Sequence, residues 1–319
     1  MKKHTKMYPD LDPELIRAIE SGTLIIFIGA GISALYGYPI WNELAKKLLN
    51  NCERDGKITK SQKAVLLSEA YDAMKQVTIA CNKYDDEKGG VDKVVQILGK
   101  EPSKEEHKKI NLIARYLAEY RCPIITTNAD LSLDNSPAFK NGLILSSLKE
   151  WNHNCDDLCL IHLHGSITDP ENMIFTSQAY ASAYRVRNQE FGKKLLELLD
   201  VNKTILFIGY GLEEFELIKY FLSDISELPN RFILKGYLDK DELNKEFDEE
   251  YYRTLGIKLI PFSKEKLGYD ALIKVLKKWN NTIKTETMAH RRIPQIISKI
   301  CNSEPTSESI KKLEGLLNE

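Results

Sequence analysis

The chain has 319 residues, of which 43% are hydrophobic and 9% aromatic, so a sizeable core can form and global disorder is excluded. This length allows one large α/β domain with an insertion, or two domains. With 45 basic and 46 acidic side chains the formal net charge is −1, and nothing in that balance indicates a nucleic acid or an anionic membrane as a partner.

No stretch of the sequence approaches the roughly 20 apolar residues of a membrane span. The first nine residues are basic and polar and lack the apolar segment of a signal peptide. We therefore expect no membrane partner and a cytoplasmic location.

The first half of the chain begins with a helix predicted over residues 13–21 and a strand over 23–28. This strand is a run of apolar, mostly β-branched residues that leads directly into Gly29-Ala30-Gly31. The pattern from Trp41 to Tyr120 is helical and strongly charged. So long a helical stretch between two strands predicts an inserted helical subdomain over about 41–120.

The second half alternates short apolar runs with helical patterns. The apolar runs cover 122–126, 143–145, 158–161, 173–175, 204–208, 232–234 and 257–260, and the helices cover 187–200, 213–224, 240–253 and 269–280. Continuous apolar strands that alternate with helices indicate a parallel sheet covered on both faces. We therefore predict a doubly wound, Rossmann-like α/β domain over residues 10–283.

Residues 284–319 differ in composition from the rest. They are polar, with Arg291-Arg292, a patch of Ser, Glu, Pro and Thr at 303–309, and a last short amphipathic run. We interpret them as a linker and a C-terminal docking helix.

Six cysteines stand at positions 52, 81, 122, 155, 159 and 301 and form no paired C-x-x-C units. Only Cys155 and Cys159 lie close together in the sequence, with His153 and His162 as the nearby candidates for further zinc ligands. This spacing is typical of reduced thiols in a cytosolic protein, and we predict no metal site.

Four apolar runs end in polar or glycine-rich segments: Gly29–Ser33, Thr126–Asp130, His162–Ser166 and Gly209–Gly211. In a parallel sheet all four converge on one edge, where ligands of doubly wound folds bind. Gly29, Gly31 and Ala34 complete a G-x-G-x-x-A spacing after the first strand. Backbone N–H groups at such a turn can approach a pyrophosphate closely, which makes a dinucleotide the first ligand to consider.

In their order and separation, these segments resemble those of the sirtuin superfamily. The motifs that carry the resemblance are Gly29-Ala30-Gly31-Ile32-Ser33, Thr126-Thr127-Asn128-Ala129-Asp130, His164-Gly165 and Phe207-Ile208-Gly209-Tyr210-Gly211. The sequence is more similar to the sirtuin-like NAD hydrolases of bacterial phage defence than to protein deacylases. It lacks the paired cysteines of the deacylase zinc ribbon, and Gly37-Tyr38-Pro39-Ile40-Trp41 departs from the deacylase pattern. An aromatic residue often stands at the position of Ala129 in the hydrolases.

Cleavage of the bond between nicotinamide and ribose creates positive charge on the sugar, as in glycoside cleavage. Asn128 suits the task of aiming a water, because its amide both donates and accepts and does not titrate. His164 suits a base, since an ordinary imidazole titrates near pH 6.5. The resemblance implies the same two catalytic roles.

The resemblance also implies that Asp130 contacts the nicotinamide amide and that Ser33 contacts phosphate or ribose. Gly209, Tyr210 and Gly211 would lie at the adenosine half. The full set of predicted binding residues is Gly29, Ala30, Gly31, Ser33, Thr127, Asp130, Gly209, Tyr210 and Gly211.

Each of these residues has an alternative structural role. Asn128 and Asp130 could cap a turn or a helix, and His164 could be a satisfied histidine at a strand end. Side-chain alternation along the strand puts His162 and His164 on the same face, so His162 is a second candidate for the base. Gly209–Gly211 could be only a tight turn, and Tyr210 and Trp41 could belong to the core.

The leading hypothesis is a bacterial cytoplasmic NAD+ hydrolase that releases nicotinamide and ADP-ribose, or cyclic ADP-ribose, as an anti-phage effector. NAD is then a substrate, and no metal is required. Such an activity must be restrained at rest, so we expect a homo-oligomer, or a partner protein or sensor domain that contacts residues 284–319. The alternatives are an NAD-dependent protein deacylase, an ADP-ribosyltransferase, a non-catalytic NAD or ADP-ribose sensor, and a dehydrogenase.

Overall fold

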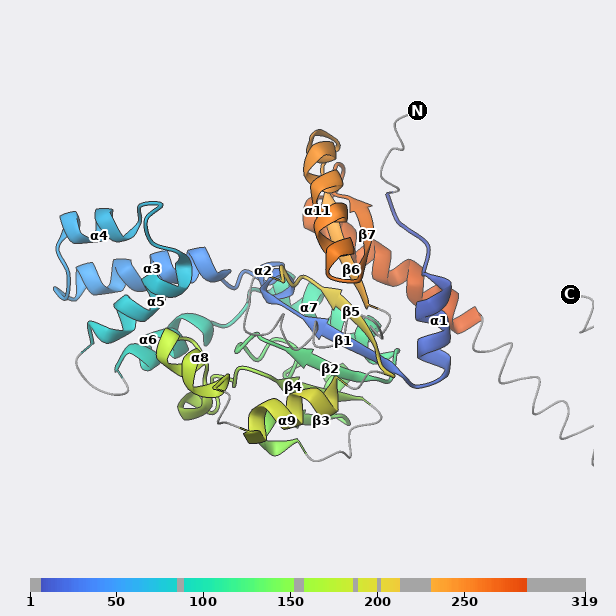
Figure 1. The fold of residues 1–319 in the computed structure, drawn as a ribbon, viewed down its shortest axis with the longest axis horizontal. Coiled ribbons are helices and arrows are strands. Elements are labelled where there is room, and N and C mark those ends of the chain that lie inside the picture. Colours follow the sequence, from blue (N-terminus) through green and yellow to red (C-terminus); the bar gives the residue numbers. More distant parts are fainter. Residues whose placement is uncertain are drawn as a thin grey trace, which may run out of the picture.

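The computed structural model describes residues 7–84, 89–151, 158–185, 189–199, 202–212 and 231–285. Seven strands of these segments form one sheet in the order β3-β4-β2-β1-β5-β6-β7 (Figure 1), and every neighbouring pair is parallel. The strands are β1 (Leu24–Ile28), β2 (Pro123–Thr126), β3 (Leu143–Leu145), β4 (Cys159–His162), β5 (Thr204–Ile208), β6 (Arg231–Tyr237) and β7 (Ile257–Ser263). The predicted α/β fold with a parallel, Rossmann-like sheet is confirmed.

Strand β1 lies at the centre of the sheet, with β2 on one side and β5 on the other. Ile26 is in register with Ile124 of β2 and with Leu206 of β5. From β1 the chain passes to β2, then to β3 at the edge of the sheet and back to β4 between β2 and β3, before it crosses to β5 on the opposite side of β1. The strand order therefore reverses between β1 and β5, and the carboxyl ends of these strands border the crevice where such folds bind ligands.

Helices flank the sheet on both faces. They are α1 (Pro13–Glu20), α2 (Ala30–Ala34), α3 (Trp41–Arg54), α4 (Lys60–Leu66), α5 (Ala73–Asn82), α6 (Gly89–Leu98), α7 (Lys104–Ala118), α8 (Ser177–Ala183), α9 (Gln189–Leu198), α11 (Glu242–Thr254) and a helix over residues 271–285. Short 3-10 turns cover Pro137–Phe139, Leu148–Glu150, Pro170–Asn172, Asp239–Asp241 and Gly268–Asp270.

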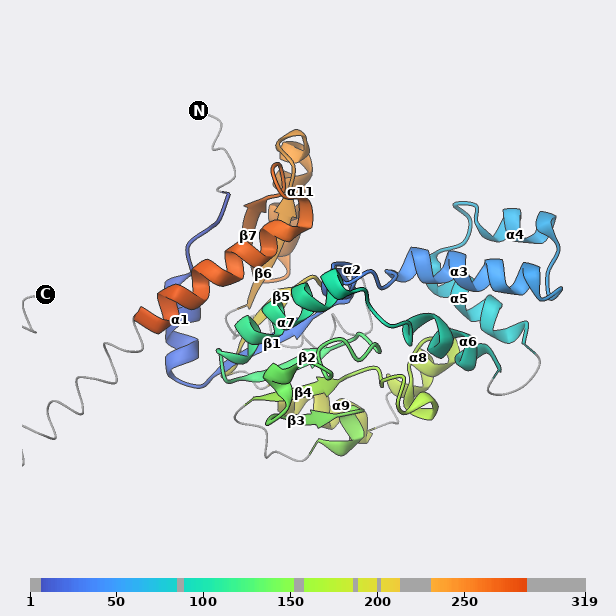
Figure 2. The same cartoon turned by 180° about the vertical axis from the view of Figure 1, so that it is seen from behind.

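Strand β1 divides its side chains between two cores, as the twofold alternation of a strand requires. Ile26 and Ile28 pack with apolar residues of α1, α7 and the helix over 271–285, which lie on the face seen in Figure 2. Ile25 and Phe27 pack on the opposite face with residues of α8 and α9. A strand buried on both sides explains why the sequence shows a continuous apolar run there.

The helices over residues 41–120 separate into two parts. Helices α3 to α6 have a hydrophobic core of their own, which includes Leu48, Val77 and Val94, and they project from the sheet as a lateral arm (Figure 1). Helix α7 instead contributes Ile113 and Leu117 to the core beneath the sheet. Helix α7 thus serves as the crossover into β2, and the arm comprises α3 to α6.

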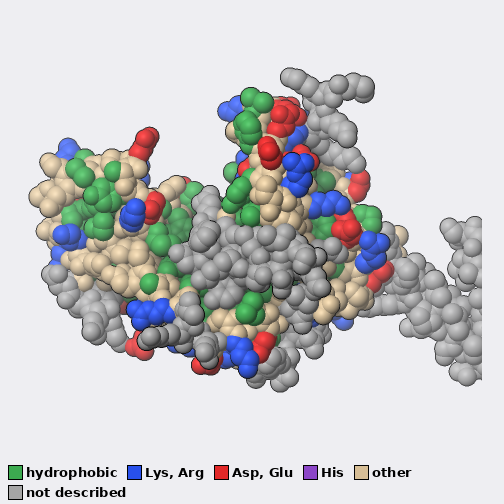
Figure 3. Space-filling model, in the orientation of Figure 1, with side chains coloured by type: hydrophobic (Ala, Val, Ile, Leu, Met, Phe, Trp, Pro, Cys, Tyr) green, Lys and Arg blue, Asp and Glu red, His purple; other side chains and the backbone are tan. Residues whose placement is uncertain are grey.

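The outer surface of α11 carries an apolar stripe. Leu243, Phe247 and Tyr251 follow one another at intervals of four residues and are 66%, 67% and 48% exposed. Figure 3 shows hydrophobic side chains gathered at this helix and at the end of the lateral arm. On its inner side α11 buries Tyr252 and Lys245.

Other predicted elements have different outcomes. The apolar run at 173–175 forms no strand and lies in a loop before α8. The predicted helix over 213–224 and the predicted docking helix within 284–319 lie outside the described residues, apart from 284 and 285, which belong to the helix over residues 271–285. None of the helices in the described ranges combines the length and the apolar character that a bilayer crossing requires.

Candidate functional site

Two glycine turns meet where the strand order reverses. Gly29 directly follows β1 and donates its N–H to Ile208 O at 3.1 Å, while the N–H of Gly31 donates to Gly209 O at 2.8 Å. A Cβ atom on Gly29 would lie 2.6 Å from Gly209 O, a distance that real Cβ atoms do not reach. Gly209 itself has φ of +64°, a left-handed conformation that favours glycine. Gly29 and Gly31 are therefore required by the β5 turn, and their N–H groups are already bonded to it.

The polar network at this corner comes from the ends of β1 and β2. The Asn128 amide nitrogen Nδ2 donates to Gly29 O at 3.0 Å and to Ser33 Oγ at 2.8 Å. Ser33 Oγ in turn donates to Asp130 Oδ2 at 2.6 Å, and the other carboxylate oxygen accepts from Ser132 N–H at 3.1 Å. Ser33 and Asp130 are buried, and Asn128 is half-buried. The structure thus brings three predicted site residues into one chain of hydrogen bonds.

A small cavity of about 40 Å³ adjoins this network. Among the predicted residues it is lined by Ala30, Ser33, Thr127, Asn128 and Asp130, and its apolar wall consists of Pro39, Trp41, Leu44, Leu98, Ala129 and Phe175. Pockets for ligands of drug size are roughly 300–1,000 Å³. A dinucleotide therefore needs wall side chains to move, or has to extend across the open edge of the sheet.

Sequence reasoning missed most of this wall. The rings of Trp41 and Phe175 lie 5.3 Å apart and join the start of α3 to the loop before α8. Trp41 stands two residues after Pro39, in the segment that follows the glycine motif, and this position could have indicated that its side chain lies near the site. Phe175 belongs to a run that the sequence left without a role, and nothing local indicates that it faces the corner.

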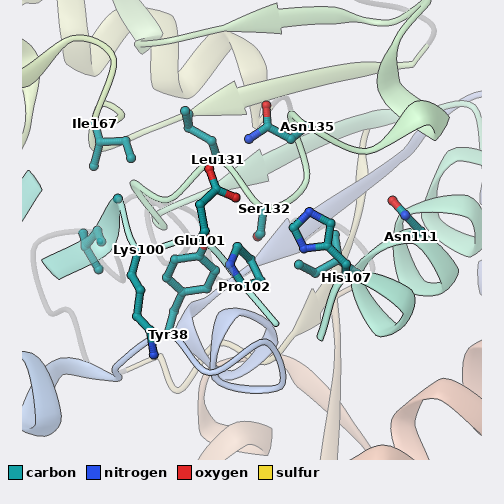
Figure 4. A pocket seen from close by; sticks show the side chains of 13 residues that line it. Tyr38, Lys100, Glu101, Pro102, His107, Asn111, Leu131, Ser132, Asn135 and Ile167 are labelled. Atoms are coloured by element: carbon teal, nitrogen blue, oxygen red, sulfur yellow. The ribbon is translucent and has the colours of Figure 1, made fainter. Parts of the chain in front are cut away.

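A second cavity, of about 80 Å³, is lined by residues of the loop after β2 and of the segment between α6 and α7 (Figure 4). Leu131 and Ser132 contribute from the first, and Glu101 and Pro102 from the second, with Tyr38 beside them. Burial, together with the carboxylates of Asp130, Glu101 and Glu106, raises the pKa of Tyr38 to about 12. The phenol is thus neutral, and no residue of the predicted site lines this cavity.

His164 lies in a tyrosine-lined pocket beyond the end of β4. Its Nε2 lies 2.7 Å from Tyr184 Oη and its Nδ1 lies 3.3 Å from Tyr180 Oη, with both rings edge-on to the imidazole. Burial lowers the pKa of His164 to about 3, so the ring is neutral at physiological pH. His164 is not among the residues that line the cavity beside Asn128.

His162 faces a different set of groups. Its Nδ1 lies 2.7 Å from Asn128 O and its Nε2 lies 3.1 Å from Asp134 Oδ1. The prediction that the two histidines share a face is wrong: β4 ends at His162, and the His164 side chain then contacts Tyr180 and Tyr184, in the core that also holds Ile161 and Leu163. The chain then turns through Gly165, whose φ is +77°, and the His164 side chain joins the tyrosines of the other core.

The remaining predicted residues lie at the end of β5. Tyr210 is buried, with its ring 4.9 Å from that of Phe27 and 5.9 Å from that of Phe207. Its side chain thus packs in the core behind the corner, whereas Gly211 is exposed. The predicted contacts of these residues with the adenosine half stay a prediction.

No group of three or more histidine, cysteine, aspartate or glutamate side chains in the described residues has the arrangement of a metal site. Cys52, Cys81, Cys122 and Cys159 are buried and form no disulfide within the described residues. Cys155 and His153 lie outside the described residues.

A parallel sheet with glycine turns at its reversal point, and an Asn-Ser-Asp network beside them, defines a Rossmann-like α/β protein with a polar site at the carboxyl edge of its strands. Comparison with protein families agrees, because a SIR2-like domain matches residues 123–260, from the start of β2 into β7. The resemblance to the sirtuin superfamily is confirmed.

Two curated relatives are similar over most of this chain. One is the protein named NAD(+) hydrolase ThsA from Enterococcus faecium, 28% identical over 253 residues, which are 74% of this chain and 48% of the relative. The other is the protein named Defense-associated sirtuin 2 from Bacillus subtilis, 24% identical over 255 residues, which are 77% of this chain and 24% of the relative. The chain therefore spans about half of the first relative and a quarter of the second.

Proposed function

We propose that this chain cleaves the nicotinamide–ribose bond of NAD+ as an effector of anti-phage defence. The products are nicotinamide and ADP-ribose, or its cyclic form. The observation that carries the proposal is the Asn128–Ser33–Asp130 network at the carboxyl edge of β1 and β2. Its support from comparison is the similarity to a protein named NAD(+) hydrolase and to one named a defence-associated sirtuin.

The network prepares Asn128 for its role. Ser33 Oγ and Gly29 O each accept a hydrogen bond from the Asn128 amide nitrogen, so the side chain is oriented before substrate binds. A fixed amide can aim a water or a ribose hydroxyl at the sugar carbon without any change in its own protonation. The buried Asp130 carboxylate then offers an acceptor for the amide N–H of nicotinamide. Positive charge that develops on the sugar is favoured beside such a carboxylate.

His164 needs a change of environment to act as a base. A histidine whose pKa is about 3 takes up a proton poorly near pH 7. Displacement of Tyr184 or Tyr180 by the ribose, or entry of water, would reverse the desolvation that lowers the pKa. In the proposed mechanism substrate binding therefore activates His164, and this matches an enzyme that has to be restrained at rest.

The test measures, by chromatography, how fast the purified protein releases nicotinamide from NAD+. Asn128→Ala and His164→Ala are each expected to lower turnover at least about 100-fold, within the range for positioning and acid–base groups. Asn111→Ala and His107→Ala are matched controls, because both residues are exposed on α7. Rates like those of the wild type in both site variants would remove these residues from the mechanism.

A non-catalytic sensor of NAD or ADP-ribose is the second candidate. The neutral, buried His164 favours it, because a histidine whose pKa is about 3 is a poor base near neutral pH. Calorimetric binding of NAD+ with no release of nicotinamide over hours would support the sensor.

The expected homo-oligomer, the partner or sensor domain at residues 284–319 and the cytoplasmic location remain part of the proposal. Light scattering of the purified chain tests the first.

A further inference from the structure

The buried pair of His162 and Asp134 lies directly beneath the loop that carries Asn128. His162 is 1% exposed and Asp134 13% exposed. The imidazole joins two segments, because Nδ1 reaches Asn128 O at 2.7 Å while Nε2 lies 3.1 Å and 3.3 Å from the Asp134 carboxylate oxygens. The backbone of Asn128 is therefore tied to β4 through one side chain.

The two hydrogen-bond partners of the His162 imidazole, Asn128 O and the Asp134 carboxylate, determine how many protons these contacts require. A carbonyl oxygen only accepts, so Nδ1 carries a hydrogen and donates it to Asn128 O. An ionised carboxylate also only accepts, so the second contact needs one more proton, either on Nε2 or on Asp134. Loss of that proton would leave the lone pair of Nε2 against a buried carboxylate, which is a repulsive arrangement.

The groups around His162 favour the bound state of that proton. Burial by itself lowers the pKa of His162, but the hydrogen bond and charge of Asp134, the Asn128 carbonyl and the charge of Asp130 together raise it. Both acidic residues that raise the pKa of His162, Asp134 and Asp130, lie on the loop after β2. The pair is thus stable below the raised pKa and weakens as the pH rises through it.

We propose that His162 and Asp134 form a positioning pair whose shared proton holds the Asn128 loop in its active arrangement, so that activity falls on the alkaline side when the proton is lost. This inference rests on the proposed NAD+ hydrolysis. His162 acts through Asn128 and needs no contact with the substrate. Its role therefore differs from that of His164, which the sequence assigned to base catalysis.

Asp134→Asn is the decisive variant. Its side-chain amide can donate to Nε2 of a neutral imidazole, which keeps its hydrogen on Nδ1 and its bond to Asn128 O. The loop is then held without the extra proton. Turnover at pH 7 is expected within about threefold of wild type, and the alkaline decrease in kcat is expected to vanish or to move by at least one pH unit, tenfold in proton concentration.

His162→Leu breaks the tie altogether. Its kcat is expected to fall at least about tenfold, within the range for outer residues that orient a functional group, with a smaller change in KM. His107→Leu on the exposed face of α7 is the matched control and is expected to behave like the wild type. Thermal unfolding of each variant separates a loss of fold from a loss of positioning.

Nitrogen-15 spectra of histidine side chains provide a readout that does not depend on activity. The chain has six histidines, and the His162→Leu variant identifies the resonance of His162 by its absence. In the wild type both ring nitrogens are expected to behave as donors near pH 7, whereas Asp134→Asn is expected to show a neutral ring with hydrogen on Nδ1. A wild-type His162 that titrates near pH 6.5 like a free imidazole would overturn the proposal.

Identical alkaline decreases in wild type and Asp134→Asn would also overturn it. If the wild type binds NAD+ but releases no nicotinamide, the hydrolase proposal fails, and the pH dependence of NAD+ affinity replaces kcat as the readout. The affinity of the wild type is then expected to weaken at alkaline pH while that of Asp134→Asn stays constant. An affinity with the same pH dependence in both proteins would reject the positioning pair independently of catalysis.

Discussion

Replacement of Gly29 by alanine tests what the first glycine turn is for. A methyl group at this position would lie 2.6 Å from Gly209 O and from Tyr210 Cα, and 2.8 Å from Tyr210 Cβ. Two of these three atoms are backbone, so relief requires that the β5 turn moves away from β1. The backbone of Gly29 has φ of −112° and ψ of −177°, which any residue adopts, so the cost arises from the contact alone.

The expected loss follows from these contacts. Overpacking a well-filled site costs typically 1–3 kcal/mol. Separation of the turns also weakens the 2.8 Å bond from Gly31 N–H to Gly209 O, worth about 1 kcal/mol. Against this, alanine restricts the unfolded chain and returns about 0.4–1 kcal/mol. The net loss is about 1–3.6 kcal/mol, which at about 2 °C per kcal/mol for a chain of this size lowers the melting temperature by roughly 2–7 °C.

Differential scanning fluorimetry of the protein without NAD+ measures this loss. Gly56→Ala is the control, since Gly56 has φ of +70° and no atom within 4 Å of an added Cβ, and its expected cost is about 1 kcal/mol from the left-handed backbone alone. If Gly29 served only to let a phosphate approach, Gly29→Ala would leave the melting temperature unchanged and would impair only NAD+ binding. That result would refute the argument from β5 packing.

Two further predictions concern stability. Burial lowers the pKa of His164 to about 3, so below about pH 6.5 the unfolded chain binds a proton at this residue that the folded chain does not bind. The free energy of unfolding therefore falls by roughly 2 kcal/mol between pH 6.5 and 5. Urea unfolding at both pH values should show this loss in the wild type and a smaller one in His164→Gln. Trp279 is fully buried and donates Nε1–H to Pro9 O at 3.0 Å, so Trp279→Phe is expected to lower the urea midpoint by an amount equivalent to about 2 kcal/mol. Nicotinamide release by Trp279→Phe at 25 °C should equal that of the wild type, and a parallel loss of activity would contradict a purely structural role.

The fold could be predicted because a strand that is buried on both faces of a sheet has a continuous apolar sequence. The run Leu24–Ile28 is apolar throughout, and only a strand covered on both sides requires this. The convergence of the strand ends followed from the parallel arrangement and is confirmed. The position of α7 was not predictable, because its pattern is helical like that of α3 to α6. Only packing shows that Ile113 joins the core beneath the sheet.

The residues at the corner were predictable, but the direction of their side chains was not. Asn128, Ser33 and Asp130 follow strand ends that the sequence locates, and they form one network. The aromatic wall of Trp41 and Phe175 joins segments more than a hundred residues apart, and no local pattern records such a contact. The role of Gly29 was also hidden, because a glycine required by a neighbouring turn and one required by a ligand look the same in a sequence.

The two histidines show how one short motif can acquire two chemistries. Within Ile161-His162-Leu163-His164 the strand ends at the first histidine, so the second is free to turn toward the opposite core. His162 then faces a carboxylate and a carbonyl, which raise its pKa, whereas His164 faces two tyrosines in a buried pocket, where desolvation lowers its pKa to about 3. Titratable groups whose environments drive their pKa values apart are suited to different tasks. In the proposed mechanism the His162 ring shares a proton with Asp134 and holds the Asn128 loop, while the His164 ring is neutral, so substrate binding can activate His164 without disturbing the pair that positions Asn128.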